Sequence, residues 1–490
     1  MITSRQSKAF VPGHTPRSML SAAICTILLL SACESADDSE RIEERPPNIV
    51  VVLADDMGWS DLSAYGSEET QTPNLDRISE AGLTFTNFYA GAPVCSPSRA
   101  GLLTGRFPVR AGVYSWIHAS QNVHLRTEEL TIAEWLKESG YDAAHVGKWH
   151  LGYDLAEGSG DGPDPGDHGF DHWLATGNNA EPSHHNPTNF VRNGVELGEV
   201  EGYSGHIVVD EALRWLDERQ DPSRPFFLNV WFHEPHQRVA APDSLVQRHQ
   251  ETALPAYYGS IENMDAAVGR LRAHLEALGV WEETLFLFMS DNGSYMEEGS
   301  NGDLSGRKTQ LWEGGIRVPG FIHWPGRIAP MQRTDTPAGV VDVFPTLAEA
   351  AGLPLPDDRT LDGVSLVPLF SGGEIERVKP LYWFYGPSRP AVVIRDGDWG
   401  LIADPVLDLP RENMFREDHI GMMKETEFTN FRLFNLRDDP QQAVDLADQE
   451  PERLSAMVEN MNALHREVID EAFDWRRFQA SGNNDGPTGR

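Results

Sequence analysis

Four short apolar stretches of this 490-residue sequence each end in a cluster of side chains that can do chemistry. The clusters are Asp55-Asp56 after residues 48–54, Gly147-Lys148-Trp149-His150 after residues 143–146, His233-Glu234-Pro235-His236 after residues 226–232, and Ser290-Asp291-Asn292-Gly293 after residues 285–289. A single Asp or His after a strand is usually a turn residue or a helix cap. Four clusters that each follow an apolar stretch predict one shared site.

Two of these clusters contain only oxygen donors. Asp55, Asp56, Asp291 and Asn292 supply three carboxylates and one amide. Adjacent carboxylates at the mouth of a buried sheet repel each other and lose solvation, a cost that a bound divalent cation offsets. Oxygen donors without a thiolate suit Ca²⁺ or Mg²⁺ better than zinc. Either pair alone is as consistent with turn chemistry as with a metal site, but the two together favour a metal.

A lone cysteine opens the segment Cys95-Ser96-Pro97-Ser98-Arg99, which continues to Thr104-Gly105. Pro97 suits the first position of a helix and Gly105 its far end. The side chain at 95 is therefore predicted at a helix N-terminus, where backbone N–H groups and the helix dipole favour an anion. Arg99, one turn later, can add a guanidinium to the same pocket. A buried, inert thiol is the ordinary alternative.

The apolar stretches are typical of buried parallel strands. Helices are predicted between them, over residues 73–81, 131–139, 206–219 and 261–278. This alternation predicts an α/β fold with a large, mostly parallel sheet flanked by helices. In such sheets ligands bind beyond the carboxyl ends of the strands, which is where the polar clusters lie.

Composition predicts a folded protein and excludes one class of partner. Apolar residues make up 40% of the chain, and its length suggests about two domains. The 75 acidic residues outnumber the 40 basic ones, a net charge of −35, which argues against nucleic acid as a partner. Any anion site must then be a local cluster of basic side chains.

The N-terminus is predicted to direct export. Three basic residues precede an apolar run over residues 19–30, which ends in Leu30-Ser31-Ala32-Cys33 and resembles a bacterial lipobox. The run is shorter than the ~20 residues of a membrane-spanning helix, the alternative. We therefore expect a lipoprotein signal peptide over residues 1–32 and a lipid on Cys33. The lipid would anchor the protein to a bacterial membrane, in the periplasm or at the cell surface. Cys95 would be the one unmodified thiol left, since Cys25 leaves with the signal peptide.

The cysteine segment resembles the formylglycine signature of the type I sulfatases, in the alkaline phosphatase superfamily. Further stretches are similar to that family and occur in its order: residues 55–59, 72–76, 147–152, 290–293, 308–319 and 361–366. Together they cover most of the chain from Pro47 onward. The resemblance is to the arylsulfatase A and N-acetylgalactosamine-6-sulfatase branch.

The resemblance implies the chemistry. In that family the cysteine is oxidised by a formylglycine-generating maturation enzyme to 3-oxoalanine (formylglycine), whose hydrate has one hydroxyl to attack sulfur and a second to expel sulfate. Cys95 is implied to be that residue. One Ca²⁺ is implied to be held by Asp55, Asp56, Asp291, Asn292 and the modified residue 95.

Five further side chains have implied roles. Arg99, Lys148 and Lys308 would hold the sulfate oxygens. His150 would act as the base on the residue 95 hydrate, and His236 would bind sulfate and help protonate the leaving oxygen. The expected substrate is a sulfated saccharide, of the galactose or N-acetylgalactosamine type.

Composition and the pattern along the chain, together with the resemblance, predict a domain organisation. It comprises a flexible tether over residues 33–46, a catalytic domain over 47–365, a C-terminal α+β subdomain over 366–479 and a disordered tail over 480–490. Short strands are expected in the subdomain over 380–385, 391–395, 400–403 and 431–436, forming a small antiparallel sheet covered by a helix over 450–472.

Three alternatives stay open. A phosphonate or phosphate monoester hydrolase on the same fold would use a similar site, because the tetrahedral anions are similar in size. A catalytically silent lipoprotein could bind sulfated glycan at the cell surface. Cys95 could also leave the cell unmodified. Several polar residues near the expected cleft are read as ordinary surface groups rather than sugar ligands: Asn178, Asn179, Glu181, His184, His185 and His233. Arg317 is expected to be structural, because Gly314-Gly315 and Val318-Pro319 mark a fixed turn.

Overall fold

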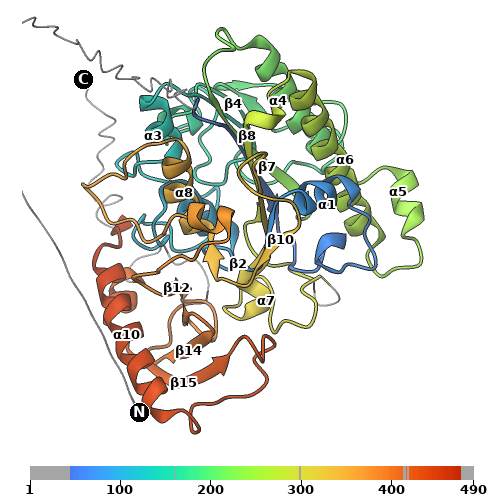
Figure 1. The fold of residues 1–490 in the computed structure, drawn as a ribbon. Coiled ribbons are helices and arrows are strands. Elements are labelled where there is room, and N and C mark those ends of the chain that lie inside the picture. Colours follow the sequence, from blue (N-terminus) through green and yellow to red (C-terminus); the bar gives the residue numbers. More distant parts are fainter. Residues whose placement is uncertain (1–44, 161, 297–299, 412–414, 416–418, 476–490) are drawn as a thin grey trace, which may run out of the picture. The chain divides into compact units, whose positions relative to one another are not determined.

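The computed structural model describes residues 45–160, 162–296, 300–411, 415 and 419–475 (Figure 1). The predicted signal peptide, the predicted lipidation site Cys33, nearly all of the predicted tether and the predicted tail lie outside these residues. The sheets and helices all belong to the unit that begins at Pro46. Among the described helices, none is long and apolar enough to cross a bilayer.

A large mixed sheet forms the centre of this unit, and its middle strands are parallel. In spatial order its strands are β10 (Gln332–Thr334), β2 (Leu83–Tyr89), β9 (Arg317–His323), β8 (Thr284–Ser290), β1 (Asn48–Asp55), β7 (Phe226–Pro235), β3 (Asp142–Lys148), β4 (His172–Thr176), β5 (Val191–Arg192) and β6 (Val195–Glu196), with β11 (Ala338–Gly339) beside β2. All eight residues of β1 are buried, because helices cover both faces of the sheet. Alternate residues of β1 accordingly belong to two separate hydrophobic clusters.

Helices pack on both sides of this sheet (Figure 1). One side holds α1 (Pro73–Glu80), α4 (Ser204–Glu218), α5 (Asp243–Arg248) and α6 (Pro255–Ala277), and the other holds α2 (Cys95–Thr104), α3 (Ile132–Glu138) and α8 (Val343–Ala350). Short elements complete the set: α7 (Glu313–Ile316), α9 (His419–Glu425) and 3₁₀ turns at Ser63–Tyr65, Pro165–His168, Trp281–Glu283, Val340–Asp342 and Val367–Ser371. The predicted α/β fold class is confirmed.

A second, four-stranded antiparallel sheet lies in the C-terminal part. Its strands are β12 (Leu381–Phe384), β13 (Val392–Asp396), β14 (Trp399–Pro405) and β15 (Phe428–Asn435), and α10 (Pro451–Asp470) packs along it (Figure 1). The small sheet plus helix is therefore as predicted. Apolar side chains of both sheets belong to one hydrophobic cluster, so the two parts share a core.

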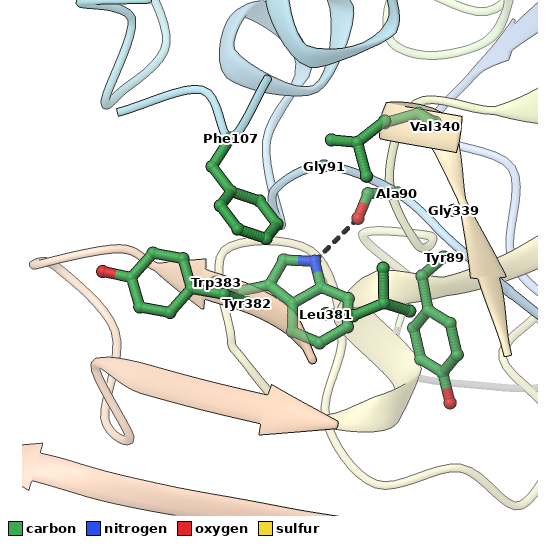
Figure 2. Close-up of a pocket in the computed structure, with 10 residues that line it drawn as sticks. Tyr89, Ala90, Gly91, Phe107, Gly339, Val340, Leu381, Tyr382 and Trp383 are labelled. Atoms are coloured by element: carbon green, nitrogen blue, oxygen red, sulfur yellow. Dashed lines mark hydrogen bonds between the residues drawn. The ribbon is translucent and has the colours of Figure 1, made fainter. Parts of the chain in front are cut away.

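One contact between these parts bears on the site. Figure 2 shows the Trp383 indole of β12 packed beside Tyr89, Phe107 and Leu381 around a small cavity. Its Nε1 donates a hydrogen bond of 2.7 Å to the carbonyl of Ala90. Ala90 lies five residues before Cys95, so the C-terminal sheet supports the segment that leads to the cysteine.

Two local expectations are wrong. Helix α2 begins at Cys95 itself rather than at Pro97, so the thiol is on the first helical residue. The predicted end is right, because Gly105 follows the helix with a φ of 66°, a conformation that favours glycine. Val318 and Pro319 form no turn and lie inside β9. The proline is tolerated there because the pairing of β9 with β2 shifts between Phe85 and Phe88, opposite the proline.

Candidate active site

Strand order brings the four predicted clusters together. Strands β8, β1, β7 and β3 are consecutive neighbours in the sheet and run parallel. Their carboxyl ends therefore share one edge, and each end carries its cluster. The side chains of Asp55, Asp56, Lys148, Asp291 and Asn292 are all buried there.

The acidic side chains are held by the loops that follow β1 and β8. Asp56 has a positive φ of 65°, which turns the chain sharply after β1. Its backbone N–H donates to Asp291 Oδ1 at 3.1 Å, and Asn292 Nδ2 donates to Asp56 Oδ1 at 2.7 Å. The backbone N–H of Asp291 in turn donates to the carbonyl of Ala54 at 3.1 Å. These bonds fix the carboxylates close together in spite of their repulsion.

Cys95 lies at the centre of this group and is 2% exposed. Its sulfur is 3.5 Å from Asp55 Oδ1 and 3.6 Å from both Lys148 Nζ and Lys308 Nζ. Burial raises the pKa of this thiol in spite of the two lysines. The unmodified side chain is therefore a protonated thiol at neutral pH and a poor nucleophile.

Arg99 lies one turn further along α2 and is completely buried. Its Nε and Nη2 donate to Asp291 Oδ2 at 2.9 and 2.7 Å, and its Nη1 donates to the carbonyl of Lys148 at 2.8 Å. The guanidinium also stacks over Trp231 of β7, 5.0 Å from the ring centroid. One side chain thus joins α2 to the ends of β3, β7 and β8.

Two lysines balance the remaining carboxylates. Lys148 Nζ is 2.6 Å from Asp55 Oδ2, and Lys308 Nζ is 2.6 Å from Asp56 Oδ1. Burial opposes ionisation of Asp55, but Lys148, His236 and Arg99 outweigh it and hold the pKa of this carboxyl well below its usual range. Burial also disfavours the charged form of Lys308, yet Asp56 raises its pKa. Three cations and three carboxylates therefore meet at this edge.

The two predicted histidines differ in their surroundings. His150 is buried, and its Nε2 lies 2.9 Å from the carbonyl of Ile117, which can only accept, so Nε2 carries the proton. Its Nδ1 has no hydrogen-bond partner among the described residues, and burial with Lys148 and Arg99 nearby lowers the pKa of the ring. The neutral ring therefore keeps a lone pair on Nδ1. His236 Nε2 lies 3.5 Å from Asp56 Oδ2, and burial lowers its pKa to about 4.

The donor set fits a hard divalent cation. One ligand atom each from Asp55, Asp56, Cys95 and His236 lie within 4.8 Å of one another. Asn292 Oδ1 is buried and has no hydrogen-bond partner in the described part of the chain, which leaves an amide acceptor available to a cation. Asp291 adjoins the group through the N–H of Asp56, although both Arg99 bonds go to its Oδ2. Sequence reasoning did not place His236 in this donor cluster.

All ten predicted site residues lie at this edge of the sheet. The expectation that the remaining polar residues are surface groups is wrong for His184 and His233, which are fully buried, and right for His185, which is exposed. His233 Nε2 lies 2.8 Å from Thr176 Oγ1, at the end of β4. Asn178, Asn179 and Glu181 line a pocket that opens beside this edge together with Tyr153, which sequence reasoning did not single out.

Comparisons with known proteins agree on one family. Residues 47–353 match the family model described as Sulfatase. The N-acetylgalactosamine-6-sulfatase of Canis lupus familiaris is 34% identical over 378 residues, covering 71% of this chain and 70% of that protein. Arylsulfatase A of Homo sapiens is 37% identical over 384 residues, covering 71% of each. The crystal structure of Ps i-CgsB in complex with k-i-k-neocarrahexaose superimposes with a TM-score of 0.74 at 26% identity, covering 90% of this chain and 99% of that one.

Proposed function

This chain belongs to the sulfatase family of sulfuric ester hydrolases, and we propose that it removes sulfate from a sulfated saccharide through a formylglycine made from Cys95. The observation that carries this proposal is the position of residue 95. It begins a helix, is buried, and has its sulfur 3.6 Å from two lysine ammonium groups and 3.5 Å from Asp55. A tetrahedral anion held by those cations would lie against the side chain of residue 95.

Oxidation is the step that makes residue 95 useful. The raised pKa of the buried thiol keeps it protonated, so the unmodified cysteine is unsuited to attack an ester. The hydrate of the aldehyde has one hydroxyl to attack sulfur and a second whose collapse to the carbonyl breaks the bond to the sulfate. A maturation enzyme must supply the oxidation, and we include it among the partners of this chain.

The chain's cations are proposed to bind the substrate. Arg99, Lys148 and Lys308 approach residue 95 from α2, β3 and the segment before α7, and would hold the sulfate oxygens from three sides. Their charge stabilises the negative charge that develops on those oxygens. His150 has a lone pair on Nδ1 and is proposed to accept a proton from the residue 95 hydrate. His236 is proposed to bind sulfate and to help protonate the leaving oxygen.

One Ca²⁺ is proposed to be held by Asp55, Asp56, Asp291, Asn292 and residue 95. The close carboxylates and the unpartnered Asn292 Oδ1 support this donor set. When bound, the ion would neutralise the carboxylates, polarise a sulfate oxygen and free the lysines that now pair with Asp55 and Asp56. Mg²⁺ prefers a smaller octahedral site with several waters, so we favour calcium for this protein-rich set.

The proposed substrate class is a sulfated sugar of the galactose or N-acetylgalactosamine type. It is supported by the likeness to N-acetylgalactosamine-6-sulfatase and by a solved relative that carries a neocarrahexaose. Because the chain has a net charge of −35, binding of a sulfated sugar depends on the local cluster of Arg99, Lys148 and Lys308.

The test is hydrolysis of 4-nitrophenyl sulfate and 4-nitrophenyl phosphate by protein shown to carry formylglycine, with calcium and after treatment with EGTA. We expect turnover of the sulfate that exceeds turnover of the phosphate, falls with EGTA and returns with calcium. Preference for the phosphate would favour a phosphate or phosphonate monoesterase. Tight binding of sulfated glycan without turnover would favour a silent binding protein.

Export as a lipoprotein is a further part of the proposal. Its support is the sequence from Arg5 to Cys33, which lies outside the described residues. Radiolabelled palmitate should enter the wild-type chain in a bacterial host, and a Cys33→Ala variant should remain unlabelled. Equal labelling of the two would refute the anchor.

A further inference from the structure

A pocket lies beside the candidate active site and has a different chemical character. It has a volume of about 420 Å³, within the range of small-molecule sites. Its polar lining includes Tyr153, Asn178, Asn179, Glu181, Asn189 and Glu196. We call these six residues, with the space they line, the asparagine pocket.

Tyr153 connects this pocket to the reacting centre. Its ring packs edge-on against His150, with the ring centroids 6.0 Å apart. On the other side the pocket begins at the end of β4, where Thr176 Oγ1 donates to the carbonyl of Asn178 at 2.6 Å. Because β4 adjoins β3, which carries Lys148, the pocket continues the same edge of the sheet. A sulfate ester held at residue 95 would have its alcohol part close to this pocket.

The loop that forms the pocket is held in place by its own hydrogen bonds. Asn189 Nδ2 donates to the carbonyl of Asn179 at 2.8 Å, and Asn189 Oδ1 accepts from the N–H of Glu181 at 2.8 Å. The N–H of Thr188 donates to the carbonyl of Glu181 at 2.7 Å. The pocket is therefore formed before a ligand arrives, which reduces the entropy lost on binding.

The lining is rich in acceptors. The side-chain carbonyl oxygens of Asn178 and Asn179 are shielded from solvent and have no hydrogen-bond partner among the described residues. Glu196 adds an exposed carboxylate that forms no ion pair with any described residue, whereas Glu181 Oε2 accepts from Arg238 Nη1 at 2.8 Å. No Lys, Arg or His is among the described residues that line the pocket itself. Hydroxyl and amide N–H groups of a ligand can donate to such a lining. A carboxylate or a second sulfate has no proton to donate and would be repelled.

This contrast leads to an inference about the substrate that rests on the proposed function. We propose that the asparagine pocket binds the sugar that bears the sulfate and selects an uncharged unit, a hexose or N-acetylhexosamine with one sulfate. A sugar that carries a carboxylate or a second sulfate is excluded. Three cations bind one sulfate group at residue 95, and the acceptor-rich pocket repels any second anionic group on the same sugar.

Kinetics on two saccharides test this inference. One substrate is N-acetylgalactosamine with a single sulfate at O6, and the other is the same sugar with sulfates at O4 and O6. Hydrolysis of 4-nitrophenyl sulfate, which has no sugar, measures the activity of the reacting centre alone. For the formylglycine-bearing wild type, we expect kcat/KM for the monosulfated sugar to exceed that for the disulfated sugar by about tenfold or more. Glu196→Lys should lower this ratio several-fold, because it places a cation at the pocket.

Two controls separate the possible outcomes. Glu196→Gln removes a charge without adding one and should lower the ratio less. Glu459→Lys makes the same charge change on the exposed face of α10 and should leave the ratio as in the wild type. Three results would overturn this inference and leave the proposed function standing. They are equal use of both sugars, turnover of neither sugar while 4-nitrophenyl sulfate is hydrolysed, and an unchanged ratio in Glu196→Lys. Loss of 4-nitrophenyl sulfate turnover in modified wild type would overturn the proposed function and this inference with it.

Discussion

At the scale of single residues, the site is built from buried charges that need one another. Arg99 has no exposed surface and donates three hydrogen bonds, two to Asp291 and one to the carbonyl of Lys148. Burial and the nearby Asp55 raise the pKa of Asp291 to about 6, so Arg99 is needed to keep this carboxylate ionised. Removing one member of such a group leaves an uncompensated charge in the interior.

Arg99→Lys should therefore be costly although it keeps the positive charge. A lysine cannot reproduce the fork to Asp291, the bond to the Lys148 carbonyl and the stacking on Trp231 together. We expect about 2–3 kcal/mol lower stability and at least a hundredfold lower kcat/KM for 4-nitrophenyl sulfate. Urea unfolding and steady-state kinetics measure the two effects. Arg466→Lys, on the exposed face of α10, is the control, and a variant as stable and active as this control would refute the role given to Arg99.

The charged residues of the site could be predicted from the sequence, because their residue types indicate their chemistry. Carboxylates, lysines and histidines that directly follow apolar strands are enough to identify Asp55, Lys148, His236 and Asp291. Neutral polar groups carry no such signal. Tyr153 and Asn189 are ordinary residue types, and their importance to the pocket follows from contacts with His150 and Asn179 that the sequence does not reveal.

At the scale of elements, the segment that carries Lys308 is held by the C-terminal part. The N–H of Leu311 donates to Ser388 Oγ at 2.9 Å, and the N–H of Glu313 donates to Gln442 Oε1 at 2.9 Å. Toward the site, the N–H of Lys308 donates to the carbonyl of Ser294 at 2.9 Å. Two side chains outside the large sheet thus fix the backbone on which a proposed sulfate ligand stands.

Ser388→Ala should loosen this segment. The change leaves the buried N–H of Leu311 without a partner, at a cost of about 1–3 kcal/mol. Because Lys308 is proposed to hold sulfate, we expect KM for 4-nitrophenyl sulfate to rise several-fold, with a smaller change in kcat. Ser371→Ala, at an exposed serine, is the control. A drop in stability without any change in KM would show that Ser388 is structural only.

A second group of charges joins α4 to the edge of the sheet and gives a pH dependence. Glu211 is paired with His172, Arg192 and Arg214. Burial opposes its ionisation, but hydrogen bonds from these three partners lower its pKa from 4.5 to about 2. A lowered carboxyl pKa stabilises the fold fully above the unfolded value, and this stabilisation is lost as the pH falls from about 4.5 toward 2.

Glu211→Gln should therefore cost stability at pH 7, and this cost should fall to roughly half or less near pH 3 and disappear only below pH 2. We expect a loss of about 1–2 kcal/mol at pH 7, since the partly exposed arginines are screened by solvent. Urea unfolding of wild type and variant at pH 7, 5, 4 and 3 measures the difference. A difference that stays constant over this range would contradict the assignment of the lowered pKa to Glu211.

Elements were predicted unevenly from the sequence. Strands β1, β3 and β8 and the helices α1, α3 and α4 were predicted within two residues at each end, because strongly apolar runs and caps such as Thr131 report local structure directly. Strand β7 continues three residues beyond its predicted end, to Pro235. Helix α6 begins at Pro255, six residues before the predicted start. Strands β2 and β9 were not predicted, because their place depends on long-range antiparallel pairing.

At the scale of the whole unit, the two sheets depend on each other. One hydrophobic cluster includes side chains of both sheets and of α10. Arg110, at the end of the α2 region, is fully buried and pairs with Glu467 and Glu471 of the α10 region. The site is supported from both sides, by Trp383 at Ala90 and by Ser388 at Leu311. The boundary proposed near residue 365 therefore separates two sheets of different topology that share one hydrophobic core.

A chain limited to residues 46–365 should fail to fold. Removal of the second sheet would expose the rings of Tyr89 and Phe107, which pack against Trp383 and Tyr382 of β12. It would also leave Arg110 with fewer partners. We expect this fragment to lack a cooperative thermal transition, whereas residues 45–475 should melt cooperatively. A soluble 46–365 fragment that melts cooperatively and hydrolyses 4-nitrophenyl sulfate would show that the large sheet is independent.

The central claim is that residue 95 becomes the nucleophile by oxidation, and mass spectrometry of the tryptic peptide that carries it is the most direct test. We expect protein from its own host, or from a host with the maturation enzyme, to yield this peptide about 18 Da lighter than the cysteine form, the change from thiol to aldehyde. The peptide from a Cys95→Ala variant provides the control for assignment. An unmodified thiol at position 95 in active protein from its own host would show that residue 95 is not the oxidised nucleophile.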